Sequence, residues 1–223
     1  MLALLHTIWQ ADGTFPSGSF AFSYGVEGAA ALGRVSDKTS LLSLVATILQ
    51  FRWATFDRVA LLQAYRASMD LSKVARIDHD VEASTFGDSM RTGSRRNGGS
   101  FLASHSALGN DAATALRLCV RRKECLGHIA VMQGAVWPTL GMDERLVQFA
   151  SGYMTASGIA SAAVRLGVVG ALQAQGVVSE ALPLIETLVA REVPEDARLS
   201  SGLPFLDIAS ARQAQASLRL FAN

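Results

Sequence analysis

The sequence is short of charged residues. It holds 20 Lys and Arg against 19 Asp and Glu in 223 residues, so the formal net charge is +1, and charged residues make up 17% of the chain. An average soluble domain carries about 25%. This balance gives no reason to expect binding to nucleic acid or to an anionic membrane. Because 50% of the residues are apolar, the excess of apolar side chains must be buried in the core or against partner proteins.

The sequence also lacks an apolar run long enough to cross a membrane. The longest stretches, residues 41–49 and 129–137, are interrupted by polar residues, glycine or proline well before the roughly 20 residues that a span requires. The N-terminus shows neither the basic region nor the cleavage pattern of a signal peptide. We therefore expect a cytoplasmic protein that makes no contact with a membrane.

Cysteine is scarce, and the motifs of common enzymes are missing. Cys119 and Cys125 would lie about 600° apart around a helix axis, hence on different faces, which predicts two reduced thiols. Their number and spacing do not fit a zinc site. The chain has no Walker-type phosphate loop, no GxSxG elbow and no HExxH pair. We expect no tightly bound nucleotide, metal or other cofactor.

What the sequence does contain is helical periodicity over nearly its whole length. Asp37 can cap a helix in which apolar residues recur at intervals of three and four from Leu41 to Leu49. Asp143 can cap a second, longer helix. The alternation of apolar and polar residues that is typical of strands is nearly absent. We predict an all-α fold and a single domain over residues 1–223.

Three segments interrupt the helical pattern. Residues 13–18 combine two glycines with a proline, which excludes a helix interior. Residues 93–100 (GSRRNGGS) are predicted to form a flexible loop. Residues 191–204, with two prolines, are predicted to link the bulk of the domain to a C-terminal segment, residues 205–223.

Few side chains suggest metal or acid–base chemistry. Asp78, His79 and Asp80 are adjacent, but successive helical residues point about 100° apart and cannot converge on one ion. A solvated helix face is the simpler interpretation. His128 and Met132 share a helix face and could touch nickel or copper, although two core residues are a commoner explanation.

Two clusters of basic residues could bind anions. Arg91, Arg95 and Arg96 lie around the expected loop at 93–100, and Arg121-Arg122-Lys123 follows later. Arginine can clamp a phosphate or a carboxylate through its planar fork. A solvated loop and a solvated helix end explain the two clusters more simply.

Aromatic residues concentrate at the N-terminus. Trp9, Phe15, Phe20, Phe22 and Tyr24 all fall within the first 24 positions. They either pack a loop onto the core or form an exposed aromatic anchor for a partner protein. The sequence alone favours neither interpretation.

Several segments carry a family resemblance that spans nearly the whole chain. They are residues 9–12 (WQAD), 15–20 (FPSGSF), 23–27 (SYGVE), 91–102 (RTGSRRNGGSFL), 161–167 (SAAVRLG) and 219–221 (RLF). In this order they resemble the signature of the urease accessory protein F family. The opening signature and the 161–167 segment are the most specific of these matches.

The resemblance implies an all-α, dimeric, cytoplasmic adaptor without an established enzyme activity. Such an adaptor would bridge a second accessory protein (the D, or H, protein) and a nickel-carrying GTPase (the G protein) on apo-urease. GTP hydrolysis in that assembly would deliver nickel to the urease active site. Nickel and GTP would then be handled by the complex rather than by this chain.

The resemblance also implies candidate interface residues. Arg219, Leu220 and Phe221 would seat a C-terminal tail that orders when the D protein binds, with Phe20 as a neighbour of the tail. Pro16, Gly18, Tyr24 and Glu27 would shape or line the same interface. Arg91, Arg95 and Arg96 are candidates for contact with the GTPase, which we expect this protein to gate by positioning and not through an arginine finger.

Two other classes of function stay open. One is a helical interaction scaffold that has no link to urease. The other is a small all-α enzyme that uses Asp78, His79 and Asp80, or Glu27 with a histidine brought near by folding. Binding to nucleic acid is the least favoured alternative.

Overall fold

The computed structural model describes residues 1–18, 22–205, 208–209 and 221, and the described part of the chain contains helices and no strand. The predicted all-α fold is therefore confirmed. The elements are α1 (Leu2–Ala11), α2 (Val26–Ala31), α3 (Lys38–Ile48), the π-helix η2 (Leu49–Asp57), α4 (Arg58–Arg66), α5 (Leu71–Ser84), α6 (Asp88–Ala107), α7 (Asp111–Arg121), α8 (Ile129–Val136), the 3-10 helix η3 (Trp137–Leu140), α9 (Glu144–Arg165) and α10 (Ala171–Val189).

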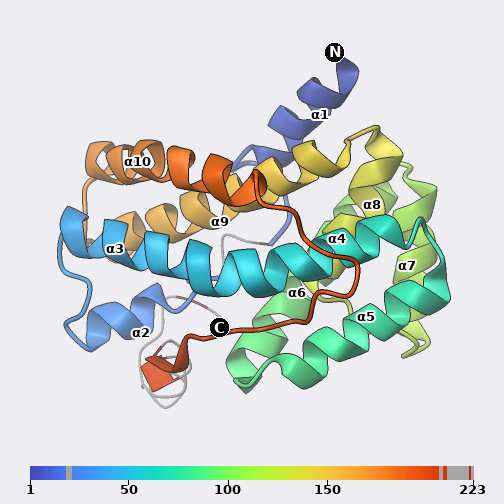
Figure 1. The fold of residues 1–223 in the computed structure, drawn as a ribbon, viewed down its shortest axis with the longest axis horizontal. Coiled ribbons are helices and arrows are strands. Elements are labelled where there is room, and N and C mark those ends of the chain that lie inside the picture. Colours follow the sequence, from blue (N-terminus) through green and yellow to red (C-terminus); the bar gives the residue numbers. More distant parts are fainter. Residues whose placement is uncertain (19–21, 206–207, 210–220, 222–223) are drawn as a thin grey trace.

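The longest feature is a continuous rod made of α3, η2 and α4, which runs along the long axis of the molecule (Figure 1). α9 and α10 pack side by side against the α3 half of the rod, with α10 above it in the view, and α5 to α8 lie around the other half. α1 stands out from the body at the upper edge of the view. None of the described helices is both long and apolar enough to cross a bilayer.

The core consists of two clusters of buried apolar side chains. One joins α4, α5, α6, α7 and α8 around Phe101, Leu116 and Trp137. The other joins α2, α3, the second half of α9 and α10. The π-helix contributes to both, because Trp53 lies in the second cluster and Phe56 in the first. η2 therefore joins the two halves of the molecule.

Two of the predicted helix starts are confirmed. The side chain of Asp37 accepts a hydrogen bond from the backbone N–H of Ser40 at 2.8 Å, and Asp143 accepts one from Leu146 at 2.8 Å. Each carboxylate satisfies an N–H that has no partner within its own helix. The apolar stripe that follows Asp37 is buried, as its spacing predicts.

The predicted flexible loop at residues 93–100 is wrong, because these residues lie inside α6. One of their glycines, Gly98, serves packing between segments. A Cβ atom at Gly98 would overlap the carbonyl oxygen of Gly127, so α6 can cross the chain there only with glycine. A glycine-rich sequence thus marks a close helix crossing here.

The segment expected to be a linker follows the rod closely. We call residues 190–203 the strap. The backbone N–H groups of Ser200 and Gly202 donate to the carbonyl oxygens of Thr55 and Phe51 in η2, at 3.0 and 3.2 Å. Val193 in the strap is buried. Residues 191–204 are therefore held on the body along their length.

The cysteines do not occupy different faces of one helix. α7 ends at Arg121, so only Cys119 is helical, and the backbone N–H of Cys125 turns back to the carbonyl of Cys119 at 3.4 Å. Both thiols are free and buried. Burial raises the pKa of each thiol, to about 12 for Cys125.

Candidate functional site

The N-terminal turn packs onto the protein through most of its rings. Phe15 is buried and meets Trp9 edge to face, with ring centroids 5.2 Å apart. Phe22 is buried and meets Tyr24 in the same geometry at 4.7 Å. Among the N-terminal rings that the structure describes, only Trp9, 39% exposed, fits the alternative of an exposed anchor. Phe20 lies outside the described residues.

Tyr24 adopts a backbone conformation that is rare for a residue with a side chain. Its φ is +53°, and that of Gly25 is +80°, so the chain turns sharply into α2. The Tyr24 ring lies over Gly158 of α9, where a Cβ atom would be 3.1 Å from the ring. Burial, reinforced by the charge of Asp57, raises the pKa of the Tyr24 phenol, while a hydrogen bond with Thr155 opposes that shift. Tyr24 therefore fixes the turn on α9.

Pro16 and Gly18 lie against α6. The carbonyl oxygen of Pro16 accepts a hydrogen bond from the Ser104 hydroxyl at 2.7 Å. Gly18 has a φ of +78°, and a Cβ atom there would lie 2.9 Å from the Cβ of Ser100. Glu27 is half-buried in the first turn of α2. These three predicted residues shape the turn, and Pro16 is the exposed one.

The C-terminal end of the chain returns to this region. Phe221 is 4% exposed, and the guanidinium of Arg165 lies 4.2 Å above its ring. A surface recess beside Phe221 is lined by Asp12, Phe22, Ser157 and Arg165, among others. The predicted interface residues Arg219 and Leu220 lie outside the described residues. The structure thus brings Phe221 to the N-terminal turn.

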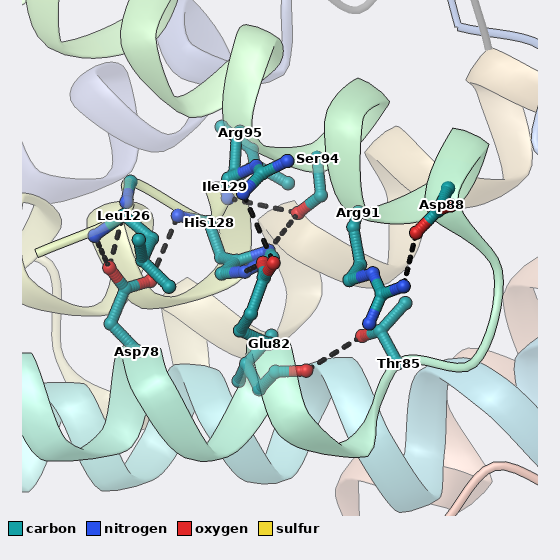
Figure 2. Close-up of polar contacts among 12 residues, drawn as sticks. Asp78, Glu82, Thr85, Asp88, Arg91, Ser94, Arg95, Leu126, His128 and Ile129 are labelled. Atoms are coloured by element: carbon teal, nitrogen blue, oxygen red, sulfur yellow. Dashed lines mark hydrogen bonds and ion pairs between the residues drawn. The ribbon is translucent and has the colours of Figure 1, made fainter.

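A second candidate site is a buried polar cluster between α5, α6 and the start of α8 (Figure 2). The carboxylate of Asp78 accepts three backbone hydrogen bonds, from Leu126 at 2.6 Å, Gly127 at 2.7 Å and His128 at 2.9 Å. Asp78 is fully buried, so the expected solvated face is wrong at this position, whereas His79 and Asp80 are exposed. We call this arrangement the Asp78 clamp.

His128 extends the cluster through both of its ring nitrogens. Nε2 lies 2.8 Å from a carboxylate oxygen of Glu82, and Nδ1 lies 3.1 Å from the Ser94 hydroxyl. Because a carboxylate only accepts, Nε2 carries the proton and Nδ1 accepts from Ser94. Burial lowers the pKa of His128. With both nitrogens engaged, His128 is a core residue and not half of a soft metal pair with Met132.

The arginines of α6 are tied to acidic residues. Arg91 pairs with Asp88, and Arg95 pairs with Glu82 at 3.1 Å (Figure 2). Arg96 is exposed on the same helix. Two of the three candidates for GTPase contact are thus held by ion pairs within the chain.

The described residues contain no group of three His, Cys, Asp or Glu side chains that could hold a metal ion. Asp78, His79 and Asp80 do not converge, since the first is buried and the other two point to solvent. Within the described residues, the hydrogen bonds of the four histidine rings lead to groups other than Glu27. What the geometry offers is a set of surfaces, held in place by buried polar contacts.

Sequence reasoning missed the two buried groups that organise this interior. Asp78 was assigned to solvent because its partners lie 48 to 50 residues away. Arg58 carried no signal at all, yet it is 4% exposed and donates to the side chain of Gln148 at 2.6 Å and to the carbonyl of Arg191 at 2.5 Å. The one signal in the sequence that could have indicated such contacts is a charged residue, arginine or aspartate, at a position within an apolar helical stripe.

Comparison with known proteins agrees with the family resemblance of the sequence. The family model described as UreF matches residues 35–182. The chain is 30% identical over 220 residues to the urease accessory protein UreF of Trichodesmium erythraeum, covering 95% of this chain and 93% of that protein. It is also 30% identical over 227 residues to the urease accessory protein UreF 1 of Brucella melitensis, covering 99% and 92%.

These matches place the chain, with its all-α fold, among the urease accessory proteins. It belongs to the UreF family. Membership supports a role in the maturation of urease together with other urease accessory proteins.

Proposed function

We propose that this protein is a cytoplasmic adaptor, without catalytic activity and without a tightly bound cofactor, in nickel delivery to urease. In this role it bridges the D (H) accessory protein and the nickel-carrying GTPase G on apo-urease. The complex then inserts nickel at the expense of GTP hydrolysis. An adaptor needs contact surfaces that are exposed and firmly held.

The observation that carries the proposal is the apolar face of α1. Leu2, Leu5 and Ile8 are 64%, 57% and 61% exposed, on a helix that stands out from the body (Figure 1). The helix is nevertheless anchored, because His6 Nδ1 lies 2.6 Å from the carbonyl oxygen of Leu140 and Gln10 is buried. Contiguous exposed apolar surface on an ordered helix is typical of a protein interface.

The same face supports a homodimer as part of the proposal. Two copies related by a twofold axis can bury their α1 faces against one another. The double variant Leu5→Glu with Ile8→Glu should then shift the protein from dimer to monomer in light scattering coupled to gel filtration. A dimer that survives this change would remove α1 from the dimer interface.

The N-terminal turn and Phe221 supply the proposed D-protein surface. Tyr24, Glu27, Pro16 and Gly18 shape the turn, and the contact of Phe221 with Arg165 brings the C-terminal end beside it. We include Phe20, Arg219 and Leu220 in this surface on the family resemblance alone.

The α6 arginines bear on how the GTPase is controlled. Ion pairs hold Arg91 and Arg95, which favours positioning over an arginine finger, since a finger must reach the partner's phosphates. Alanine substitution of Arg91, Arg95 or Arg96 should change GTP turnover in the complex by less than about tenfold. A loss of several orders of magnitude from one substitution would identify a finger.

The proposed function is tested in a strain that lacks only this chain. Urease protein should be abundant but carry little nickel and little activity, and the intact gene supplied in trans should restore both. Normal, nickel-loaded urease in that strain would overturn the proposal and favour a helical scaffold with other partners.

A further inference from the structure

A basic surface at the C-terminal end of α7 is left unused by the proposed function. It consists of Arg117, Leu118, Arg121, Arg122 and Lys123, which we call the basic corner. Arg121, Arg122 and Lys123 are exposed, and Leu118 is 45% exposed among them. In the part of the chain that the structure describes, none of these four cations lies within ion-pair distance of a carboxylate.

Helix geometry gathers these side chains on one face. Residues three and four apart are neighbours on a helix, so Leu118 lies beside Arg121 and Arg122. The opposite face of α7, with Leu116 and Cys119, is buried. The helix dipole favours cations in a last turn, but it accounts neither for Lys123 beyond the helix nor for an exposed leucine among the arginines.

The turn that carries the corner is rigidly held. The backbone N–H groups of Lys123 and Glu124 donate to the carbonyls of Val120 and Cys119, both at 3.0 Å. His79 on α5 donates from Nε2 to the carbonyl of Glu124 at 3.2 Å. Cys125 is buried, and the next three residues are held by the Asp78 clamp. A surface fixed in this way loses little conformational entropy when a partner binds.

The α6 arginines show what the basic corner lacks. Arg91 and Arg95 have carboxylate partners within the chain, so their charges are already balanced. Among the described residues the charges of the corner have no carboxylate within ion-pair distance, which leaves them open to solvent ions or to another molecule. Arginine and an apolar neighbour together suit a partner that offers carboxylates and an apolar side chain at adjacent positions.

We propose that the basic corner docks an acidic amphipathic helix of a partner protein. Carboxylates of that helix pair with Arg121, Arg122 and Lys123, and one of its apolar side chains covers Leu118. A nucleic acid would satisfy the cations but leave Leu118 uncovered, and the net charge of +1 provides no wider field to attract a polyanion. This surface is separate from α1 and from the N-terminal turn, so the inference does not depend on the proposed function.

The test measures binding of labelled probes to the full-length chain by fluorescence anisotropy. The probe is a synthetic helix of about 20 residues with a leucine stripe flanked by glutamates. Its controls are the same helix with lysine for glutamate, the same helix with alanine for leucine, and single-stranded DNA of equal charge. The variants are Arg121→Glu with Arg122→Glu, Leu118→Ser, and the matched charge control Arg34→Glu with Arg198→Glu, two exposed sites elsewhere.

The glutamate–leucine helix should bind, more weakly as salt increases, and the lysine helix should not. The double substitution in the corner should weaken binding by about tenfold or more, because it replaces attraction by repulsion. Leu118→Ser should weaken binding of this probe severalfold without affecting the alanine version, and the control variant should match the unaltered protein.

Three results would overturn the inference. They are equal binding of the acidic and lysine helices, equal losses in the corner and control variants, and DNA binding that is as tight as that of the acidic helix. Thermal unfolding of each variant provides the folding check, and all of these exposed substitutions should leave the melting temperature unchanged within about 2 °C.

Discussion

α1 and α5 distribute their side chains in opposite ways. α1 exposes Leu2, Leu5 and Ile8 to solvent, whereas α5 buries the carboxylate of Asp78 completely. Some of the protein's many apolar side chains therefore lie on its surface, while some of its few charged side chains are buried. The stability of the protein should accordingly depend on polar residues of the interior, and its association on apolar residues of the surface.

The largest effect is expected at the Asp78 clamp. Asp78→Ala leaves three N–H groups without their acceptor, two of them buried and one partly buried. This loss should cost about 3–4 kcal/mol of unfolding free energy and lower the melting temperature by about 10 °C. Calorimetry measures this, with the exposed neighbour Asp80→Ala as control. A shift as small as that of the control would show that solvent or a rearranged turn replaces the carboxylate.

Arg58 should rank next. Its guanidinium holds the end of α10 through the carbonyls of Val189 and Arg191, and burial lowers its pKa to about 10. Arg58→Met should cost about 2–3 kcal/mol, because the buried acceptors lose their donor. Urea unfolding, with exposed Arg34→Met as reference, provides the measurement. A loss below about 0.5 kcal/mol would mean that these contacts contribute little.

A pH titration tests a third buried polar group. Burial lowers the pKa of His105 to about 4 from 6.5, and its Nε2 donates to the side-chain oxygen of Gln10 at 3.0 Å. The unfolded chain binds the proton first as pH falls, so stability is present above about pH 6.5 and is lost between pH 6.5 and 4. Between these values the unaltered protein should lose about 1–2 kcal/mol more than His105→Gln. Parallel pH profiles of the two proteins would contradict this assignment.

The smallest effect on stability is expected at α1. Leu5→Ser removes an exposed side chain and should change the unfolding free energy of the dilute protein by less than about 0.5 kcal/mol. Leu116→Ser, fully buried, should cost about 3 kcal/mol or more. If the two substitutions cost the same at low protein concentration, Leu5 packs against the body and the contrast between the surface of α1 and the buried interior fails.

Local features of the fold followed from the sequence, and contacts between distant segments did not. The Asp37 cap and the stripe that follows it depend on residues within one or two turns. The glycine-rich segment 93–100 predicts a loop, and this prediction is wrong, because Gly98 serves a close approach to the carbonyl of Gly127, in a distant segment of the chain. Asp78 was placed in solvent for the same reason.

The sequence predicted that the protein has contact surfaces, but it located them only in part. The excess of apolar residues predicted contact surfaces, but nothing in the composition located one on α1. The family signature indicated the N-terminal turn, where Tyr24 and Gly18 do shape the chain. Periodicity could not show that Arg95 would face a carboxylate, because Glu82 belongs to another helix.

The π-helix has a consequence for insertions and deletions. A π-turn contains one more residue than the α-turn it replaces, since its hydrogen bonds span five residues instead of four. Deleting one residue between Leu49 and Asp57 can therefore be absorbed by closing η2 into an α-helix, which keeps α3 and α4 on their present faces. The same deletion within α3 would rotate everything after it by about 100° and turn buried side chains to solvent. A deletion of one residue in this rod should therefore be tolerated in its middle and nowhere else along it.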